Sequence, residues 1–139
     1  MAVAEGLRLP FIGEEGIQCE YLEMFPYVGE RQFITYETSE WSCVCPFSGL
    51  PDYGTLTIEY VPHLHCVELK SLKYYLVSYR NVGIYQEPAT NRLFQDLFQF
   101  LTPAYLSITT RYNTRGGIDA VCRIEKGQRN ALESQLVSH

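Results

Sequence analysis

Two stretches in the first half of the chain alternate between hydrophobic and polar residues, which is the pattern of a strand with one buried face. The first is RQFITYETSEW, residues 31–41. The second is GTLTIEYVP, residues 54–62, in which Leu56, Ile58 and Tyr60 share one face. We therefore expect two strands, with a turn region rich in Gly and Pro between them.

The hydrophobic period then lengthens to that of a helix. In residues 67–81, VELKSLKYYLVSYRN, one helical face carries the side chains of Leu69, Leu72, Leu76 and Tyr79. A second helix is predicted over residues 88–101, PATNRLFQDLFQFL, where leucines recur at positions 93, 97 and 101. Pro88 suits the first turn of that helix, because a missing N–H loses no partner there, and Pro103 ends it.

Two more strands are predicted at residues 105–113 and 118–126, and the double glycine Gly116-Gly117 between them is typical of a hairpin turn. The order strand-strand-helix-helix-strand-strand predicts an α+β fold, in which a four-stranded antiparallel sheet carries two helices on one face. Such an open sheet has two free edges. These edges favour edge-to-edge assembly of several copies into a ring.

The two ends of the chain lack this periodicity. Residues 1–30 are rich in Gly, Glu and Pro, and we expect them to form a loosely structured arm. Residues 127–139 are expected to form a polar C-terminal tail. The folded domain is therefore predicted over residues 31–126, within a chain of 139 residues that is long enough for one domain with a sizeable core.

Composition and charge narrow the classes of function. The chain has 11 basic and 16 acidic residues, a net charge of −5, so its overall charge does not favour nucleic acid as a direct partner. No apolar run is long enough to cross a membrane, and the first residues lack the basic end and apolar core of a signal peptide. We therefore expect a cytoplasmic protein. Five cysteines without regular spacing favour free thiols over a disulfide framework.

The candidate chemistry lies in residues 41–54, WSCVCPFSGLPDYG. Cys45 is followed by proline and a turn, which places its thiol near a loop. Cys43 lies among apolar residues, where a thiol often packs as a small hydrophobe. Cys45 is therefore the candidate nucleophile, and Asp52, a lone acid seven residues further on, could supply a proton to its reaction.

A zinc site is the alternative use of the same region. Thiolate and imidazole ligands could come from Cys43, Cys45, His63, His65 and Cys66, and zinc prefers four such ligands in a tetrahedron. However, the Cys-x-Cys and His-x-His spacings differ from those of a typical zinc knuckle. We therefore expect no metal, and we expect the two histidines to be exposed at the end of a strand.

Two motifs follow each other in a specific order and at a specific distance. Residues 45–52, CPFSGLPD, fit the pattern Cys-Pro-x-Thr/Ser-x-x-Pro-Asp. A second pattern, Glu-x-Lys-Ser/Ala-x-Lys-x-aromatic, is matched by Glu68, Lys70, Ser71, Lys73 and Tyr75. With the Arg-Gly-Gly hairpin near the end, the chain resembles the QueF family of nitrile reductases, in its short, single-module form, over residues 30–125.

This resemblance implies a tunnelling fold, in which ββααββ subunits assemble into a ring barrel, a decamer of two stacked pentamers, with active sites between neighbours. It implies NADPH-dependent reduction of the nitrile of 7-cyano-7-deazaguanine to 7-aminomethyl-7-deazaguanine, in the biosynthesis of queuosine, a tRNA modification. Cys45 would attack the nitrile carbon to form a covalent thioimide, and Asp52 would protonate the nitrile nitrogen.

The resemblance also assigns the ligand contacts. The substrate-binding residues would be Val67, Glu68, Leu69, Gln86 and Glu87. Glu87 would anchor the flat purine analogue, because a carboxylate can accept two N–H donors at once. For each glutamate the alternative is an acid at a helix start, stabilised by the helix dipole.

NADPH would be held by Lys70, Ser71, Lys73 and, in the glycine hairpin, Arg115. The chain contains no G-x-G-x-x-G motif after a strand, so cofactor binding is implied by the resemblance alone. The alternative is that the two lysines form a solvated helix face.

Three positions depart from the family pattern. Gln86 stands where family members commonly have histidine, and glutamine can hold a substrate by hydrogen bonds but cannot carry a proton near neutral pH. Leu50 stands where glutamine is common, and no cysteine follows Glu87 closely.

Two other functions remain open on the sequence. The first is an amidinotransferase of the archaeosine type, which keeps the cysteine and the aspartate but adds ammonia to the nitrile on a tRNA. Those relatives lack the Glu-x-Lys-Ser signature, and the acidic charge of this chain disfavours tRNA. The second is a catalytically idle purine-binding module of the same fold, against which the intact Cys45 and Asp52 argue.

Overall fold

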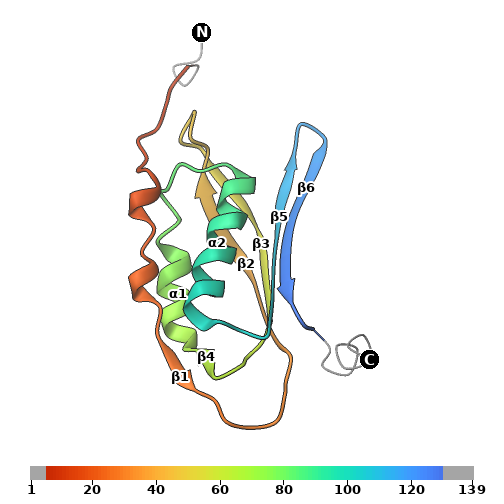
Figure 1. Ribbon diagram of the computed structural model, residues 1–139. Coiled ribbons are helices and arrows are strands. Elements are labelled where there is room, and N and C mark those ends of the chain that lie inside the picture. Colours follow the sequence, from red (N-terminus) through yellow and green to blue (C-terminus); the bar gives the residue numbers. More distant parts are fainter. Residues whose placement is uncertain (1–5, 130–139) are drawn as a thin grey trace.

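The computed structural model describes residues 6–129. Its long elements are two α-helices and four strands, and two three-residue strands form a second, small sheet (Figure 1). In chain order they are β1 (Met24–Pro26), β2 (Ile34–Val44), β3 (Pro51–Val61), β4 (His65–Val67), α1 (Leu69–Val77), α2 (Gln86–Leu101), β5 (Tyr105–Arg115) and β6 (Ile118–Gly127).

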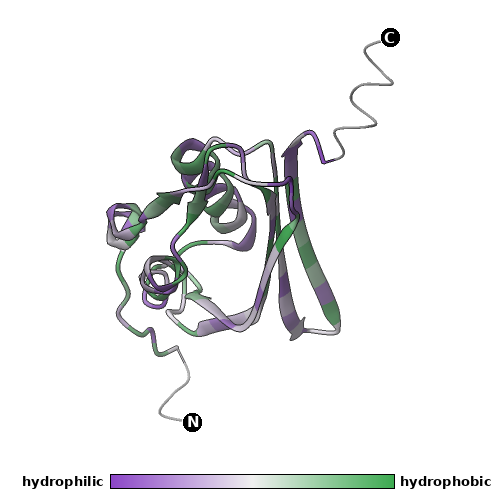
Figure 2. Ribbon diagram, turned by 90° about the horizontal axis from the view of Figure 1, so that it is seen from below, coloured by the Kyte–Doolittle hydropathy of each residue, from purple (hydrophilic) through white to green (hydrophobic). Residues whose placement is uncertain are grey.

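The main sheet has the strand order β2-β3-β5-β6, and every pair of neighbours is antiparallel. Both helices lie on one face of this sheet and leave the other face uncovered (Figure 2). The predicted α+β fold with two helices on one face is therefore confirmed. The β5–β6 hairpin turns at Gly116 and Gly117, whose φ angles of 57° and 76° lie in the region that a type I′ turn requires.

The core lies between the sheet and the helices. On β3, Leu56, Ile58 and Tyr60 are all buried, as the alternating pattern predicted. The leucines of α2, at positions 93, 97 and 101, pack onto this face together with buried residues of β5. Residues with the opposite parity on β3 and β5 point to the uncovered face and are more polar.

The first helix is shorter than its hydrophobic period suggested. We predicted a helix over residues 67–81, whereas α1 spans Leu69–Val77 and is followed by a turn. Glu68 is the N-cap of α1, since its carboxylate accepts hydrogen bonds from the backbone N–H groups of Lys70 and Ser71. Leu69 was predicted on the buried face but is 44% exposed.

The strand that carries Asp52 begins earlier than expected. β3 starts at Pro51, so Asp52 lies within the strand, opposite Cys43 of β2, and not in the turn. Close packing of β3 against β5 depends on Gly54, because a Cβ at this position would come within 2.3 Å of the Arg111 carbonyl oxygen.

The segment before residue 31 is more ordered than the sequence suggested. It contains two short 3-10 turns, Glu14–Gly16 and Cys19–Tyr21, and β1, which pairs with β4. Ile17 and Leu22 belong to the hydrophobic core. The sequence missed this packing because isolated apolar residues between glycines have no regular period. Nearly all of the predicted tail lies outside the described residues, and the division into arm, domain and tail stays a prediction.

No helix in residues 6–129 combines the length and the apolar character that crossing a bilayer requires.

Candidate active site

Cys45 lies directly after β2, in a tight turn that leads into β3 (Figure 1). Its backbone N–H donates to the carbonyl oxygen of Leu50 at 2.9 Å, and its carbonyl oxygen accepts from the N–H of Gly49 at 2.8 Å. Gly49 has a φ of 75°, which a residue with a side chain rarely adopts. The turn therefore holds the half-buried Cys45 thiol at the end of the sheet.

The turn also makes the Cys45 thiol more acidic. Hydrogen bonding from the backbone of Ser48 is the largest influence, and a backbone N–H of Phe47 lies 3.4 Å from the sulfur atom. Together they lower the pKa of Cys45 below its ordinary value, although partial burial and the negative charge of Asp52 act in the opposite direction. A lower pKa increases the thiolate fraction at neutral pH, and the thiolate is the nucleophile.

Cys43, two residues earlier, has the opposite environment. It is fully buried, and its thiol donates to the carbonyl oxygen of Ile84 at 3.7 Å. Burial, with the nearby charge of Asp52, raises the pKa of the Cys43 thiol to about 11. The structure therefore supports the assignment of Cys43 as a packing residue, and Cys45 is the more acidic and more accessible thiol of the pair.

Asp52 forms an ion pair with Arg115 of the β5–β6 hairpin. The guanidinium Nη2 atom lies 3.0 Å from Asp52 Oδ1 and also donates to the carbonyl oxygen of Pro51 at 2.5 Å. The resemblance had placed Arg115 with the cofactor. In this structure its partner is the candidate proton donor.

A buried hydrogen bond supports this end of the sheet. The indole N–H of Trp41, on β2, donates to the hydroxyl oxygen of Tyr112, on β5, at 3.0 Å. Both side chains are buried, and they belong to the same core cluster as Cys43. This bond joins β2 and β5 inside the core, and it therefore supports the end of the sheet at which Cys45, Asp52 and Arg115 lie.

Gln86 and Glu87 begin α2 at the same end of the molecule as Cys45 (Figure 1). The connection is direct, because Val44 donates its N–H to Val82 at 3.0 Å and accepts from the N–H of Ile84 at 3.1 Å. The Glu87 side chain is exposed in the first turn of α2. Cys45, Asp52, Gln86 and Glu87 thus lie at one end of the fold, which is the arrangement that their predicted roles need.

The second group of predicted residues lies at the opposite end. Val67 is the last residue of β4, and Glu68, Lys70 and Ser71 follow at the start of α1 (Figure 1). The backbone N–H of Val67 donates to the Tyr60 hydroxyl at 3.2 Å. Tyr60 comes eight residues after Asp52 on β3, a separation of roughly 26 Å along a strand. One chain therefore does not bring these two groups together.

Several residues of this second group already have partners in the chain. Glu68 caps α1, and those backbone hydrogen bonds lower the pKa of its carboxyl group. The Ser71 hydroxyl accepts from the N–H of Glu23 at 2.9 Å and donates to the carbonyl oxygen of Glu68 at 2.7 Å. Ser71 is buried and holds the arm against α1, so its observed role is structural. Lys70 lines an open groove of about 640 Å³ beside it.

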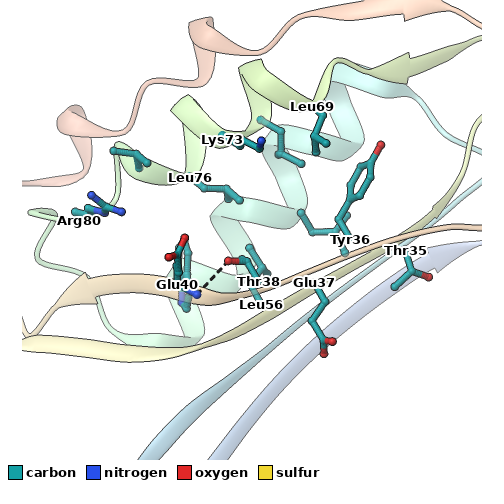
Figure 3. A pocket seen from close by; sticks show the side chains of 14 residues that line it. Thr35, Tyr36, Glu37, Thr38, Glu40, Leu56, Leu69, Lys73, Leu76 and Arg80 are labelled. Carbon is teal, nitrogen blue, oxygen red and sulfur yellow. Dashed lines mark hydrogen bonds between the residues drawn. The ribbon is translucent and has the colours of Figure 1, made fainter.

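Lys73 lines a separate groove of about 500 Å³ between α1 and β2 (Figure 3). Its walls are mostly apolar, with Leu69 and Leu76 on the helix side. Lys73 and Arg80 supply positive charge from the helix side. Glu37 and Glu40 line the same groove from β2, and the Glu37 carboxylate points away from α1 (Figure 3). The groove therefore combines apolar walls with two cations and two carboxylates, and the phosphates of a dinucleotide would be attracted to its Lys73 and Arg80 side.

Sequence reasoning missed Arg80 and the arm. Arg80 follows Lys73 by seven residues, a spacing that returns to the same helical face, so the period could have indicated it. Within residues 6–129, no three His, Cys, Asp or Glu side chains gather as metal ligands, and His65 instead lies on β4, opposite Pro26.

The site can be compared with known proteins. The family of QueF-like proteins matches residues 51–131. A protein of Thermotoga maritima is 51% identical over 119 residues, which are 85% of this chain and 87% of the relative. A protein of Caldicellulosiruptor bescii is 49% identical over 123 residues, covering 86% and 94%. Both relatives are named NADPH-dependent 7-cyano-7-deazaguanine reductase.

The fold also matches a solved structure. The crystal structure of the archaeosine synthase QueF-Like in the apo form superposes with a TM-score of 0.66, over 73% of this chain and 100% of that chain. At 22% sequence identity this similarity shows the fold alone. Together with the family match over residues 51–131 and two relatives of about half-identical sequence, it shows that the chain belongs to the family of QueF-like proteins.

Proposed function

We propose that this protein is an NADPH-dependent nitrile reductase that converts 7-cyano-7-deazaguanine into 7-aminomethyl-7-deazaguanine, a step of queuosine biosynthesis. The observation that carries the proposal is an acidified thiol, Cys45, on a rigid turn at the same end of the sheet as Asp52. The names of the half-identical relatives give the substrate and the cofactor.

The first step would be addition of the Cys45 thiolate to the nitrile carbon. A nitrile is a poor hydride acceptor, and forming a covalent thioimide divides one difficult reduction into easier steps. The Asp52 carboxyl group is held in place by the Arg115 guanidinium. It would take the proton of the Cys45 thiol and pass it to the nitrile nitrogen, so that the thioimide forms as a neutral species.

Reduction of the thioimide would then release the cysteine. NADPH, when bound, supplies a hydride to the carbon of the thioimide and a second hydride to that of the imine. Loss of the Cys45 thiolate between these steps gives the imine, and protons taken up from solvent complete the amine. Glu87 would hold the purine edge, and Gln86 would contribute hydrogen bonds without carrying a proton.

Lys73 and Arg80 are the residues best placed to hold the cofactor phosphates, because both line the groove between α1 and β2. Ser71 contributes to this region by fixing the start of α1, through the bonds described above. The groove lies along β2, which pairs on one side only within the described residues.

The location of the groove favours assembly into a ring. β2 and β6 are the outer strands of the sheet, and they run antiparallel to each other, so β6 of one copy could pair with β2 of the next in the same antiparallel sense. The groove, with Glu68 near one end, would then lie at the junction of two copies. A substrate that contacts both Cys45 and Glu68 would need residues from two chains, given their separation in one chain. We take a decamer of two pentamers as the expected assembly.

One assay tests the reaction. Purified protein is incubated with 7-cyano-7-deazaguanine while NADPH absorbance and the mass of the protein are followed. Consumption of two NADPH for each product supports the reductase, and a thioimide adduct is expected before NADPH is added. An adduct without any NADPH oxidation would instead favour the amidinotransferase. Absence of both adduct and turnover would leave only a binding module.

The nucleophile is tested by substitution. Cys45→Ala should abolish the adduct, because no other described thiol is both acidified and next to Asp52. Cys19→Ser, at an exposed cysteine outside the site, is the matched control and should form the adduct at the wild-type rate. An adduct of unchanged yield in Cys45→Ala would refute the assignment.

A further inference from the structure

The N-terminal arm crosses the outside of the Cys45 turn. The backbone N–H of Leu9 donates to the carbonyl oxygen of Ser48 at 2.8 Å, in the middle of the turn. The guanidinium carbon of Arg8 lies 4.4 Å from the centre of the Phe47 ring. These contacts join two segments that are about forty residues apart in the sequence and make the arm part of the surroundings of the nucleophile.

Glycine at position 49 makes this approach possible. A Cβ at Gly49 would come within 2.3 Å of the Leu9 carbonyl oxygen, so the arm and the turn pack backbone against backbone. Gly49 is buried although it lies in a surface turn, and the arm is what covers it.

The same arm is also hydrogen-bonded to residues 81–83, in the segment that leads into α2. Ile12 donates its N–H to the Asn81 carbonyl oxygen at 2.9 Å and accepts from the N–H of Gly83 at 2.8 Å. On its other side, the segment 81–84 is bonded to Val44, the residue before Cys45. The arm, residues 81–84 and the end of β2 thus run side by side and are joined by backbone hydrogen bonds.

We propose that residues 8–12 act as a positioning strap that fixes Cys45 relative to Gln86 and Glu87, with Leu9 as the positioning residue for the Cys45 turn. Leu9 acts through its backbone N–H and touches no reacting atom. The inference rests on the proposed role of Cys45. If the hydrogen bonds of residues 8–12 are lost, the reactivity of the Cys45 thiol should fall. The domain should stay folded, because residues 8–12 are mostly exposed and contribute little to the core.

The physical link runs through the turn geometry. The Cys45 sulfur is close to backbone N–H groups of the turn, at Phe47 and Ser48, and these stabilise the thiolate only while the turn keeps its shape. The charged groups around the turn are Asp52 on β3, Arg115 paired with it, and Arg8 of the arm. Substitution of Leu9 leaves all three charges in place, so a change in reactivity would report on the turn.

The test compares Leu9→Pro with Leu9→Ala. Proline removes the N–H that bonds Ser48, whereas alanine keeps it and removes only a partly exposed side chain. Iodoacetamide labelling of Cys45, followed by peptide mass spectrometry across a pH series, is the readout. In Leu9→Pro we expect the labelling rate at pH 7 to fall roughly three- to tenfold and the midpoint to move to higher pH, as loss of one supporting hydrogen bond would produce. Leu9→Ala should match the wild type.

A backbone ester at residue 9 gives an independent version of the test. Cys19 is exposed, so a synthetic peptide of residues 1–18 can be ligated to the rest of the chain at that position. The ester removes the N–H and leaves the side chain and the chain direction unchanged, which covers the case in which Leu9→Pro does not fold.

A wild-type labelling profile in a folded ester or proline variant would overturn the proposal. A general loss of structure would be recognised because the normally buried Cys43 would become labelled as well. Because labelling needs neither nitrile nor NADPH, its result is independent of whether the proposed reductase activity is found.

Discussion

Asp52 and Arg115 lie at the end of the sheet that carries Cys45, and their ion pair decides how the acid can act. The Arg115 guanidinium fixes the position of the Asp52 carboxyl group through this contact. We propose that this contact orients Asp52 to move the proton of the Cys45 thiol to the nitrile nitrogen. Arg115 would then act in thioimide formation, before any hydride is transferred.

Substitution of Arg115 distinguishes this role from cofactor binding. Arg115→Gln should slow thioimide formation in the absence of NADPH by roughly tenfold, because removing one partner of a charge-assisted pair leaves Asp52 misplaced. Arg115→Lys should restore part of the rate. Arg111→Gln, at an exposed arginine on the same strand, is the control. If Arg115 binds only the cofactor, thioimide formation will stay at the wild-type rate and only the KM for NADPH will rise.

The two neighbouring cysteines should differ sharply in reactivity with pH. Hydrogen bonds from the turn lower the pKa of Cys45, so its thiolate, and hence its rate of alkylation, should increase at lower pH than for an ordinary cysteine. Burial raises the pKa of Cys43 to about 11, so Cys43 should stay unlabelled through neutral and mildly alkaline pH. Quantitative mass spectrometry of the peptide that contains both residues measures each rate. Equal labelling of the two thiols in the folded protein would contradict this assignment.

At the scale of elements, the start of α1 joins three parts of the chain. Ser71 links the backbone of Glu23 in the arm to that of Glu68, and Glu68 caps the helix. The family signature Glu-x-Lys-Ser therefore contains residues whose observed contacts are structural. Its serine and glutamate hold the helix start, and its second lysine, Lys73, lines the groove.

Loss of the Ser71 hydroxyl should therefore reduce stability. Ser71→Ala removes the acceptor of the Glu23 N–H and should lower the free energy of unfolding by about 1–3 kcal/mol, the cost of leaving a partly buried backbone group without its partner. Ser39→Ala, at an exposed serine of β2, should change it by less than about 0.5 kcal/mol. Urea titration followed by circular dichroism measures both. A role confined to cofactor contact would leave the stability of Ser71→Ala unchanged.

Hydrophobic periodicity was sufficient to predict some of the helices and strands. Alternation in residues 54–62 placed Leu56, Ile58 and Tyr60 correctly, and the repeated leucines identified α2. The ends of α1 and β3 could not be predicted in the same way. The end of a helix depends on its cap, here the Glu68 carboxylate, and the start of β3 depends on pairing of Asp52 with Cys43 across the sheet.

At the scale of the whole molecule, the predicted site residues around Cys45 and those around Glu68 lie at opposite ends of the folded subunit. We propose that another copy in the assembly supplies the α1 groove to the Cys45 end, so that two chains complete one site. Each complete site would then contain Cys45 from one chain and Lys73 from another.

Complementation between two inactive variants tests this arrangement. Cys45→Ala lacks the nucleophile and Lys73→Glu reverses the charge in the groove. Co-expression should produce mixed rings in which about a quarter of the sites combine both intact residues, and activity should recover accordingly. Each variant alone provides the baseline, and light scattering verifies that the rings form. Recovery no greater than the sum of the two baselines would mean that each site lies within one chain.

The sequence by itself determined the order of the long elements and the identity of most of the buried faces, and it singled out Cys45 as the candidate nucleophile. The elements follow from local spacing, a period of two or of about four residues. Cys45 follows from its place before Pro46 and a turn, together with the resemblance to the QueF family. Only the tertiary structure decided which distant residues are in contact. In the folded protein Arg115 pairs with Asp52, Glu68 lies far from Cys45, and the arm lies over the Cys45 turn. These contacts join residues far apart in the chain, and no local period encodes which distant groups meet once the core has formed.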